Sequence, residues 1–210
     1  MSDQPTWHEA VQAAARQAAV TETRTWYGDD ATFNYRWEHV QVVVRLAIRL
    51  ADLTGADREI AEAAAWLHDI ARAHSKNHGA DGAIAVRRVL AQTDFPQEKI
   101  EAVADAILKH VGLATAEPVE PLEAAVLWDA DKLSKLGATI VLHFTGHLLM
   151  QGKTTTAQLL DELLDSSWME DTVRSFHTAP ARAAGRKRLE VYRAFCQRAI
   201  QEFDGDDLAL

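Results

Sequence analysis

Cysteine, proline and glycine are all scarce in this 210-residue chain. Its single cysteine, Cys196, excludes an intrachain disulfide and a cluster of thiolate metal ligands. With only five prolines and ten glycines, the chain has few points at which a helix is forced to end. Residues that favour helices, such as Ala, Leu, Glu, Gln and Arg, recur throughout. This composition predicts an all-α protein.

Basic charge and long apolar runs are missing as well. The 22 basic residues are outnumbered by 31 acidic ones, for a net charge of −9, which argues against a protein that binds the nucleic-acid backbone. No apolar run approaches the ~18 residues of a membrane-spanning helix, and residues 1–10 do not resemble a signal peptide. We therefore expect a cytoplasmic protein that binds neither nucleic acid nor a membrane.

The length fits one compact domain. Apolar residues recur at helical spacing over nine segments, which are residues 6–20, 35–54, 57–72, 79–93, 96–110, 122–136, 138–150, 155–177 and 179–204. No alternating strand pattern and no inter-domain linker interrupts them. Residues 21–34 break the helical pattern and are expected to form a loop across the site described below. The sequence predicts a single all-α domain spanning residues 1–210.

An adjacent histidine and aspartate, His68 and Asp69, stand in the segment Ala65-Trp66-Leu67-His68-Asp69-Ile70-Ala71. Adjacent side chains lie about 100° apart on a helix, so one turn can offer an imidazole and a carboxylate to the same cation. The dipeptide alone is a weak signal. Imidazole and carboxylate ligands together suit Zn, Mn, Fe, Ni or Co better than Ca or Mg.

Further residues of ligand type lie on the predicted helices around this pair. His39 and His110 each extend an apolar stripe, whereas periodicity does not choose between Asp129 and Asp131. A single buried histidine is more often a hydrogen-bonded core residue than a metal ligand. Several such residues on separate helices are harder to explain in that way, because a buried carboxylate needs a partner.

His39, the His68-Asp69 pair and Asp131 within Ala130-Asp131-Lys132-Leu133 resemble the signature of the HD superfamily of metal-dependent phosphohydrolases. The resemblance covers residues 35–137 and implies an all-α HD-domain helical bundle, on which helices of residues 138–204 pack. It implies that these four residues hold a divalent transition metal. It also leaves Asp129 as a residue that orients a ligand.

Two more segments are similar to the dinuclear members of that superfamily. These are His78-Gly79-Ala80-Asp81-Gly82-Ala83 and Ala106-Ile107-Leu108-Lys109-His110. In that branch two extra histidines bind a second ion, and the counterpart of Asp69 bridges both ions. The connection from Asp69 to His78 is shorter than we expect for that branch. The resemblance therefore does not decide whether one ion or two ions bind. His78 and His110 would be the ligands of the second ion.

The activity implied by the resemblance is hydrolysis of a nucleotide or another small phosphate ester by a metal-activated water. Asp69 would be catalytic through the metal, and Arg72 and Lys132 would act on the phosphate as catalytic cations. Lys76 and Arg36 would bind substrate, and Arg36 also matches a common family pattern three residues before the first metal-ligand histidine. The ordinary alternative for Arg72, Lys76 and Lys132 is a solvated charge.

Two other functions stay open at this point. Some proteins with this fold are oxygenases with a di-iron site, which would require both His78 and His110. A non-catalytic nucleotide-binding regulatory module would keep the fold while losing metal ligands, and the presence of every core ligand argues against it. A homodimer is compatible with the sequence, and fold alone does not identify the substrate.

Overall fold

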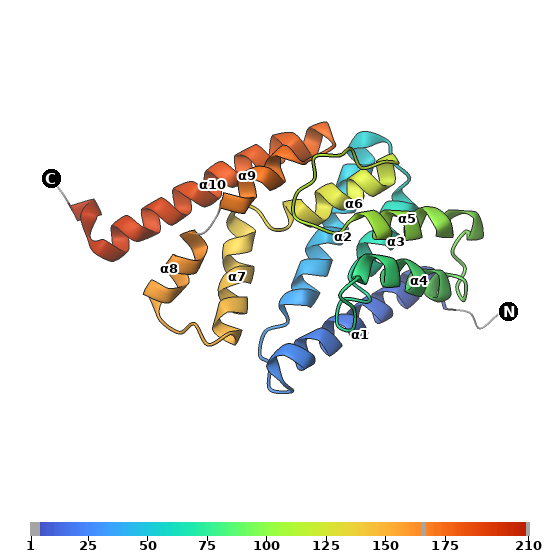
Figure 1. Ribbon diagram of the computed structural model, residues 1–210, viewed down its shortest axis with the longest axis horizontal. Helices are drawn as coiled ribbons and strands as arrows, with labels where there is room; N and C mark the ends of the chain where they lie inside the picture. Colours follow the sequence, from blue (N-terminus) through green and yellow to red (C-terminus); the bar gives the residue numbers. More distant parts are fainter. Residues whose placement is uncertain (1–4, 165–166, 209–210) are drawn as a thin grey trace.

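The computed structural model describes residues 5–164 and 167–208 (Figure 1). Within these ranges it contains helices and no β-strand, so the predicted all-α fold class is confirmed. The helices are α1 (Trp7–Tyr27), α2 (Tyr35–Thr54), α3 (Arg58–Leu67), α4 (His78–Leu90), η1 (Gln97–Lys99), α5 (Ile100–Lys109), α6 (Leu122–Leu133), α7 (Ala138–Met150), α8 (Thr156–Leu164), α9 (Ser167–Arg174), α10 (Ala179–Asp204) and η2 (Asp206–Leu208). No described helix combines the length and the apolarity needed to cross a membrane.

Helix α1 is longer than the sequence pattern predicts. It starts in a capping box, in which the Thr6 hydroxyl accepts the N–H of Glu9 and the Glu9 carboxylate accepts the N–H of Thr6. It then continues to Tyr27, so the predicted loop over residues 21–34 begins only at Gly28. The reason is that the buried stripe of α1 does not stop at its last alanine but includes Glu22, which is itself buried.

Helices α2 and α3 are joined by two residues that set their ends. Gly55 ends α2 in the left-handed conformation at φ 79°, as a C-cap glycine does. Asp57 then caps α3 by accepting the N–H groups of Glu59 and Ile60. Helix α3 ends at Leu67, five residues before the predicted end, so His68 and Asp69 lie at a helix terminus and in a turn rather than on the helix.

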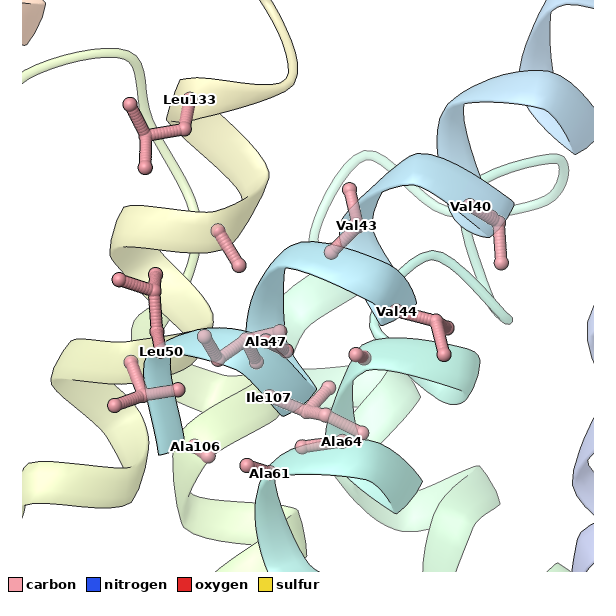
Figure 2. Packing of buried hydrophobic residues seen from close by; sticks show 14 of the residues in the cluster. Val40, Val43, Val44, Ala47, Leu50, Ala61, Ala64, Ala106, Ile107 and Leu133 are labelled. Carbon is pink, nitrogen blue, oxygen red and sulfur yellow. The ribbon is translucent and has the colours of Figure 1, made fainter. Parts of the chain in front are cut away.

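The core lies between α2, α3, α5 and α6, and Figure 2 shows it from close by. Val43 and Ala47 of α2 are fully buried with Ala61 and Ala64 of α3 and Ile107 of α5. Small side chains allow the backbones of packed helices to approach closely. This packing holds the ends of α3 and α5 beside α2, which positions the candidate site.

The C-terminal helices pack on this core through a buried carboxylate. Asp129 of α6 accepts the N–H of His177 at 2.9 Å and the N–H of Thr178 at 2.8 Å, directly before α10. Helix α10 has the predicted bounds and extends away from the core, so its C-terminal end lies far from the start of α1 (Figure 1). The predicted helix over residues 155–177 is divided into α8 and α9, and its residues 165–166 lie outside the described residues.

Candidate metal centre

The structure brings together six side chains that the sequence singles out. They come from α2, from the C-terminal ends of α3 and α5, from the first residue of α4 and from α6, and they are His39, His68, Asp69, His78, His110 and Asp131. All are buried except His78, whose side chain is 13 % exposed. His78 is the first residue of α4, one residue before the predicted helical segment 79–93.

The orientation of three imidazole rings follows from the partners of their Nδ1 atoms. His68 Nδ1 lies 2.8 Å from the carbonyl oxygen of Ala65, and His110 Nδ1 lies 2.5 Å from that of Ile107. A carbonyl oxygen only accepts hydrogen bonds, so both Nδ1 atoms carry the proton. The Nε2 atoms of His68 and His110 consequently present lone pairs to the interior of the site.

His39 has the same tautomer for a less direct reason. Its Nδ1 lies 3.0 Å from Ser134 Oγ, and this hydroxyl donates its own proton to the carbonyl oxygen of Asp131 at 2.6 Å. Ser134 can therefore only accept from His39, which places the proton on Nδ1. The Nε2 atoms of His39 and His68 face each other at 3.2 Å with a lone pair each, an arrangement that calls for a cation between them.

Asp69 lies between two groups of possible ligands, one on each of its oxygens. Its Oδ2 is 3.3 Å from His68 Nε2 and 3.8 Å from His39 Nε2. Its Oδ1 is 3.7 Å from His110 Nε2 and 3.8 Å from His78 Nε2. In each group the ligand atoms lie within 4.8 Å of one another, which is close enough for a single ion to contact all of them. The residues present fit two metal positions that share Asp69.

Asp131 faces the first of these groups and is held by two lysines. Its Oδ1 lies 3.2 Å from His39 Nε2 and also accepts from Lys135 Nζ, while its Oδ2 accepts from Lys132 Nζ at 2.6 Å. Lys132 is fully buried, donates in addition to the carbonyl oxygen of His110, and lies 4.0 Å above the ring of Trp128. Lys132 thus joins α6 to the end of α5 beneath the site.

Arg36 and Glu22 form a buried ion pair at the edge of the site. Arg36 Nη1 lies 2.5 Å from Asp69 Oδ2, and Arg36 Nη2 lies 3.1 Å from Glu22 Oε1. Arg72 Nε lies 3.5 Å from the same Glu22 oxygen, with 41 % of its side chain exposed. Arg36 is therefore occupied by carboxylates, whereas Arg72 remains accessible.

Burial and charge act in opposite directions on the pKa values of this centre. Burial lowers the pKa of His39 to about 3 and that of His78 to about 4, and it also lowers the pKa of His110. For Asp69, burial favours the neutral acid, but the charge of Arg36 and the other groups around the carboxylate together outweigh burial and hold the pKa well below its usual range. The centre at neutral pH therefore combines neutral imidazoles with an ionised carboxylate, which are the protonation states that metal ligands need.

The centre opens into a cleft of about 430 Å³. Asp69, His78, His110 and Asp131 reach its surface, while His39, His68 and Lys132 lie beneath it. The rest of its lining comes from α1, α2, α7 and the segments after α3, α5 and α6, and it includes Glu22, Trp26, Tyr27, Tyr35, Arg36, Arg72, Leu113, Lys135 and His147.

Residues 36–136 match the family model of the HD domain. The chain carries an HD domain. Its structure is similar to a predicted HD superfamily hydrolase from an uncultured Thermotogales bacterium, with 22% identity, 94% of each chain covered and a TM-score of 0.67. It is also similar to an HD-superfamily hydrolase from Bacillus thuringiensis, with 20% identity, 95% of this chain and 99% of the other covered, and a TM-score of 0.66.

A third structure with the same fold is Bacillus subtilis YpgQ, which was solved in complex with ADP. It is 19% identical over 90% of this chain and 96% of the other, with a TM-score of 0.62. No curated protein sequence matches the chain significantly. At these identities the solved structures show that the chain shares their fold.

The four basic residues predicted to act on substrate lie in different positions relative to the cleft. Arg72 lines the cleft, Arg36 lines it while bound to two carboxylates, and Lys132 lies buried below it. Lys76 is exposed in the connection before α4 and is not among the residues that line the cleft. Its role in substrate binding stays a prediction.

Several cleft residues were not identified from the sequence. Glu22 extends the buried stripe of α1, and that continuation was the available signal. Lys135 follows Asp131 by four residues, a spacing that places both on one face of the predicted helical segment 122–136. In the structure α6 ends at Leu133, and Lys135 contacts Asp131 from the turn that follows. His147 of α7 also lines the cleft, where its Nδ1 lies 2.9 Å from the Tyr27 hydroxyl. The loop was predicted over residues 21–34. Its first part is helical and lines the cleft from α1 through Glu22, Thr23, Trp26 and Tyr27, whereas residues 28–34 do not line it.

Proposed function

We propose that this HD domain is a metal-dependent phosphohydrolase that acts on a nucleotide or another small phosphate ester. The observation that carries the proposal is the convergence of the Nε2 lone pairs of His39, His68 and His110 around the ionised Asp69. Without a cation these buried lone pairs and the carboxylate would face one another. The arrangement is one that divalent transition metals stabilise.

The ligand set that we propose has two parts. His39, His68, Asp69 and Asp131 would hold one ion, and Asp69 would share a second ion with His78 and His110. Bound divalent ions would supply a lowered pKa for water and charge stabilisation for phosphoryl oxygens.

The other side chains act around these ligands. Ser134 fixes the tautomer of His39 through the hydrogen bond at 3.0 Å. Lys132 orients Asp131 and the end of α5 from below, so we assign it a positioning role rather than contact with phosphate. Arg36 holds Asp69 by its ion pair, and Glu22 in turn holds Arg36.

Phosphate binding falls to the cations that reach the cleft. Arg72 has an exposed guanidinium and only one ion pair, at 3.5 Å. Lys135 lines the cleft from the end of α6. Both can turn toward an anion, because a long flexible side chain needs little rearrangement to do so. The presence of ADP in YpgQ, a protein with this fold, supports a nucleotide as the substrate.

The proposal extends to the organisation of the chain. Residues 1–210 would form one domain that acts in the cytoplasm, and a homodimer stays a prediction. A di-iron oxygenase is the second candidate, because the two ligand groups that share Asp69 also satisfy its requirement for both His78 and His110.

A hydrolysis assay separates these functions. Purified protein is stripped with a chelator, reloaded separately with Mn, Co, Ni, Zn or Fe, and assayed against a panel of nucleotides and small phosphate esters. We expect phosphate release that disappears on chelation and returns with metal. Asp69→Asn should abolish it, while Asp81→Asn, which changes an exposed aspartate of α4, should not. Activity that survives thorough chelation, or dioxygen consumption without phosphate release, would refute the proposal.

A further inference from the structure

A second cavity, of about 190 Å³, lies beside the metal cleft. Tyr35, Leu113 and Lys135 line both, so the two cavities are neighbours on either side of these residues. The ring of Tyr35 lies nearly parallel to that of His39, with centroids 6.1 Å apart. The second cavity therefore begins one side chain away from the metal centre.

The lining of this cavity is mainly apolar and aromatic. Phe144 of α7, Trp168 of α9 and Tyr192 of α10 contribute rings to it in addition to that of Tyr35. Tyr192 has its hydroxyl group committed to the carbonyl oxygen of Leu163 at 2.6 Å, which leaves its ring for contact. Lys135 has its ammonium group on Asp131, toward the metal centre. The cavity is thus lined by several aromatic side chains, with a cation at the border to the cleft.

The size of the cavity limits what it can hold. Sites for a whole small-molecule ligand measure roughly 300–1,000 Å³, so 190 Å³ accommodates only part of one. The neighbouring cleft of about 430 Å³ has the charged and metal-binding side chains, together with the rings of Trp26, Tyr27 and Tyr35. The metal-binding side chains thus lie in the cleft, whereas Lys135 is the one charged residue among the described residues that line the second cavity.

We propose that the second cavity is a substrate subsite that receives a planar aromatic group, such as a nucleobase, while the attached phosphate occupies the metal cleft. The inference rests on the proposed phosphohydrolase function and narrows its substrates to phosphate compounds that carry such a group. Aromatic rings bind planar groups by stacking, largely irrespective of their hydrogen-bonding pattern. Phe144 and Trp168 would provide the stacking, and Lys135 would contact the phosphate where the cavities meet.

The test compares two ligands that resist hydrolysis of the P–P link. One is α,β-methylene-ADP, and the other is methylenediphosphonate, which has the same phosphonate unit without the nucleoside. Their dissociation constants are measured by calorimetry in the presence of Mn²⁺, with wild-type protein and with Phe144→Leu. The matched control is Phe203→Leu, the same change at an exposed position of α10 that does not line the cavity.

We expect Phe144→Leu to raise the dissociation constant of the nucleotide analogue roughly tenfold. The dissociation constant of methylenediphosphonate should stay within about twofold of its wild-type value. Phe144→Tyr, which keeps the ring, should retain the affinity, and Phe203→Leu should change neither ligand. Trp168→Leu repeats the test from a different helix, so a loss of folding in one variant leaves the other decisive. Equal losses for the two ligands, or none, would overturn the subsite.

A failure of the proposed subsite can be distinguished from a failure of the proposed phosphohydrolase function. If the protein hydrolyses phosphate esters with and without an aromatic group equally well, and the Phe144 and Trp168 variants behave as wild type, the subsite is refuted and the phosphohydrolase stands. If the binding difference is observed but no metal supports hydrolysis, the subsite stands and the phosphohydrolase is refuted.

Discussion

Ser134 accepts a hydrogen bond from His39 and cannot donate one to it, because the Ser134 hydroxyl proton is already donated to the carbonyl oxygen of Asp131. This single hydroxyl therefore determines which nitrogen of His39 faces the metal centre. A partner of a ligating histidine typically changes metal affinity 10- to 100-fold when it is removed.

We predict that Ser134→Ala weakens metal binding by about 10- to 100-fold while the protein remains folded, because His39 can then present either nitrogen to the centre. The measurement is a competition titration of Zn²⁺ against a chelating dye. Ser175→Ala is the matched control, since Ser175 is also buried and donates to the carbonyl oxygen three residues before it. Equal affinities in the two variants would contradict the role of Ser134.

The two lysines on Asp131 are predicted to differ in what they support. Lys132→Met removes a fully buried partner of a buried carboxylate, so it should destabilise the protein by about 3–5 kcal/mol. Lys135→Met removes a side chain that is 20% exposed and reaches the cleft, so it should raise KM several-fold with a smaller loss of stability. Urea unfolding and steady-state kinetics measure the two effects. A stability loss that is the same in both variants would argue against this division.

Asp129 is predicted to stabilise the folded protein without affecting metal binding. Asp129→Ala leaves the N–H groups of His177 and Thr178 without their buried acceptor, at a cost of about 2–4 kcal/mol. The metal content of the folded variant should equal that of wild type, as measured by elemental analysis. Asp30→Ala, at an exposed position, should change stability by less than about 0.5 kcal/mol. Loss of metal in folded Asp129→Ala would show that this aspartate supports the metal centre.

Much of the fold could be predicted because local signals set it. Gly55 can adopt the left-handed conformation that ends α2, and Asp57 can cap the N-terminus of α3, so both boundaries were predictable. The end of α3 was not, because Ala71 continues the apolar periodicity although the helix has already ended at Leu67. Tertiary contacts around His68 override periodicity at that point.

The candidate site was also only partly predictable from sequence periodicity. Periodicity alone left Asp129 and Asp131 equivalent, and only the resemblance to the HD superfamily separated them. In the structure Asp131 faces His39, whereas Asp129 accepts two backbone N–H groups before α10. Glu22 was missed because a glutamate at the end of an apolar stripe is normally solvated. Its buried position is explained only by the ion pair with Arg36, which the sequence does not show.

The most direct test of the metal centre is anomalous diffraction from a crystal soaked in Mn²⁺. We predict two peaks about 3.5–4 Å apart, with Asp69 between them, one beside His39 and His68 and the other beside His78 and His110. A single peak, with His110 engaged only through Ile107, would contradict the shared role of Asp69. An absence of any peak at these residues would contradict the metal centre itself.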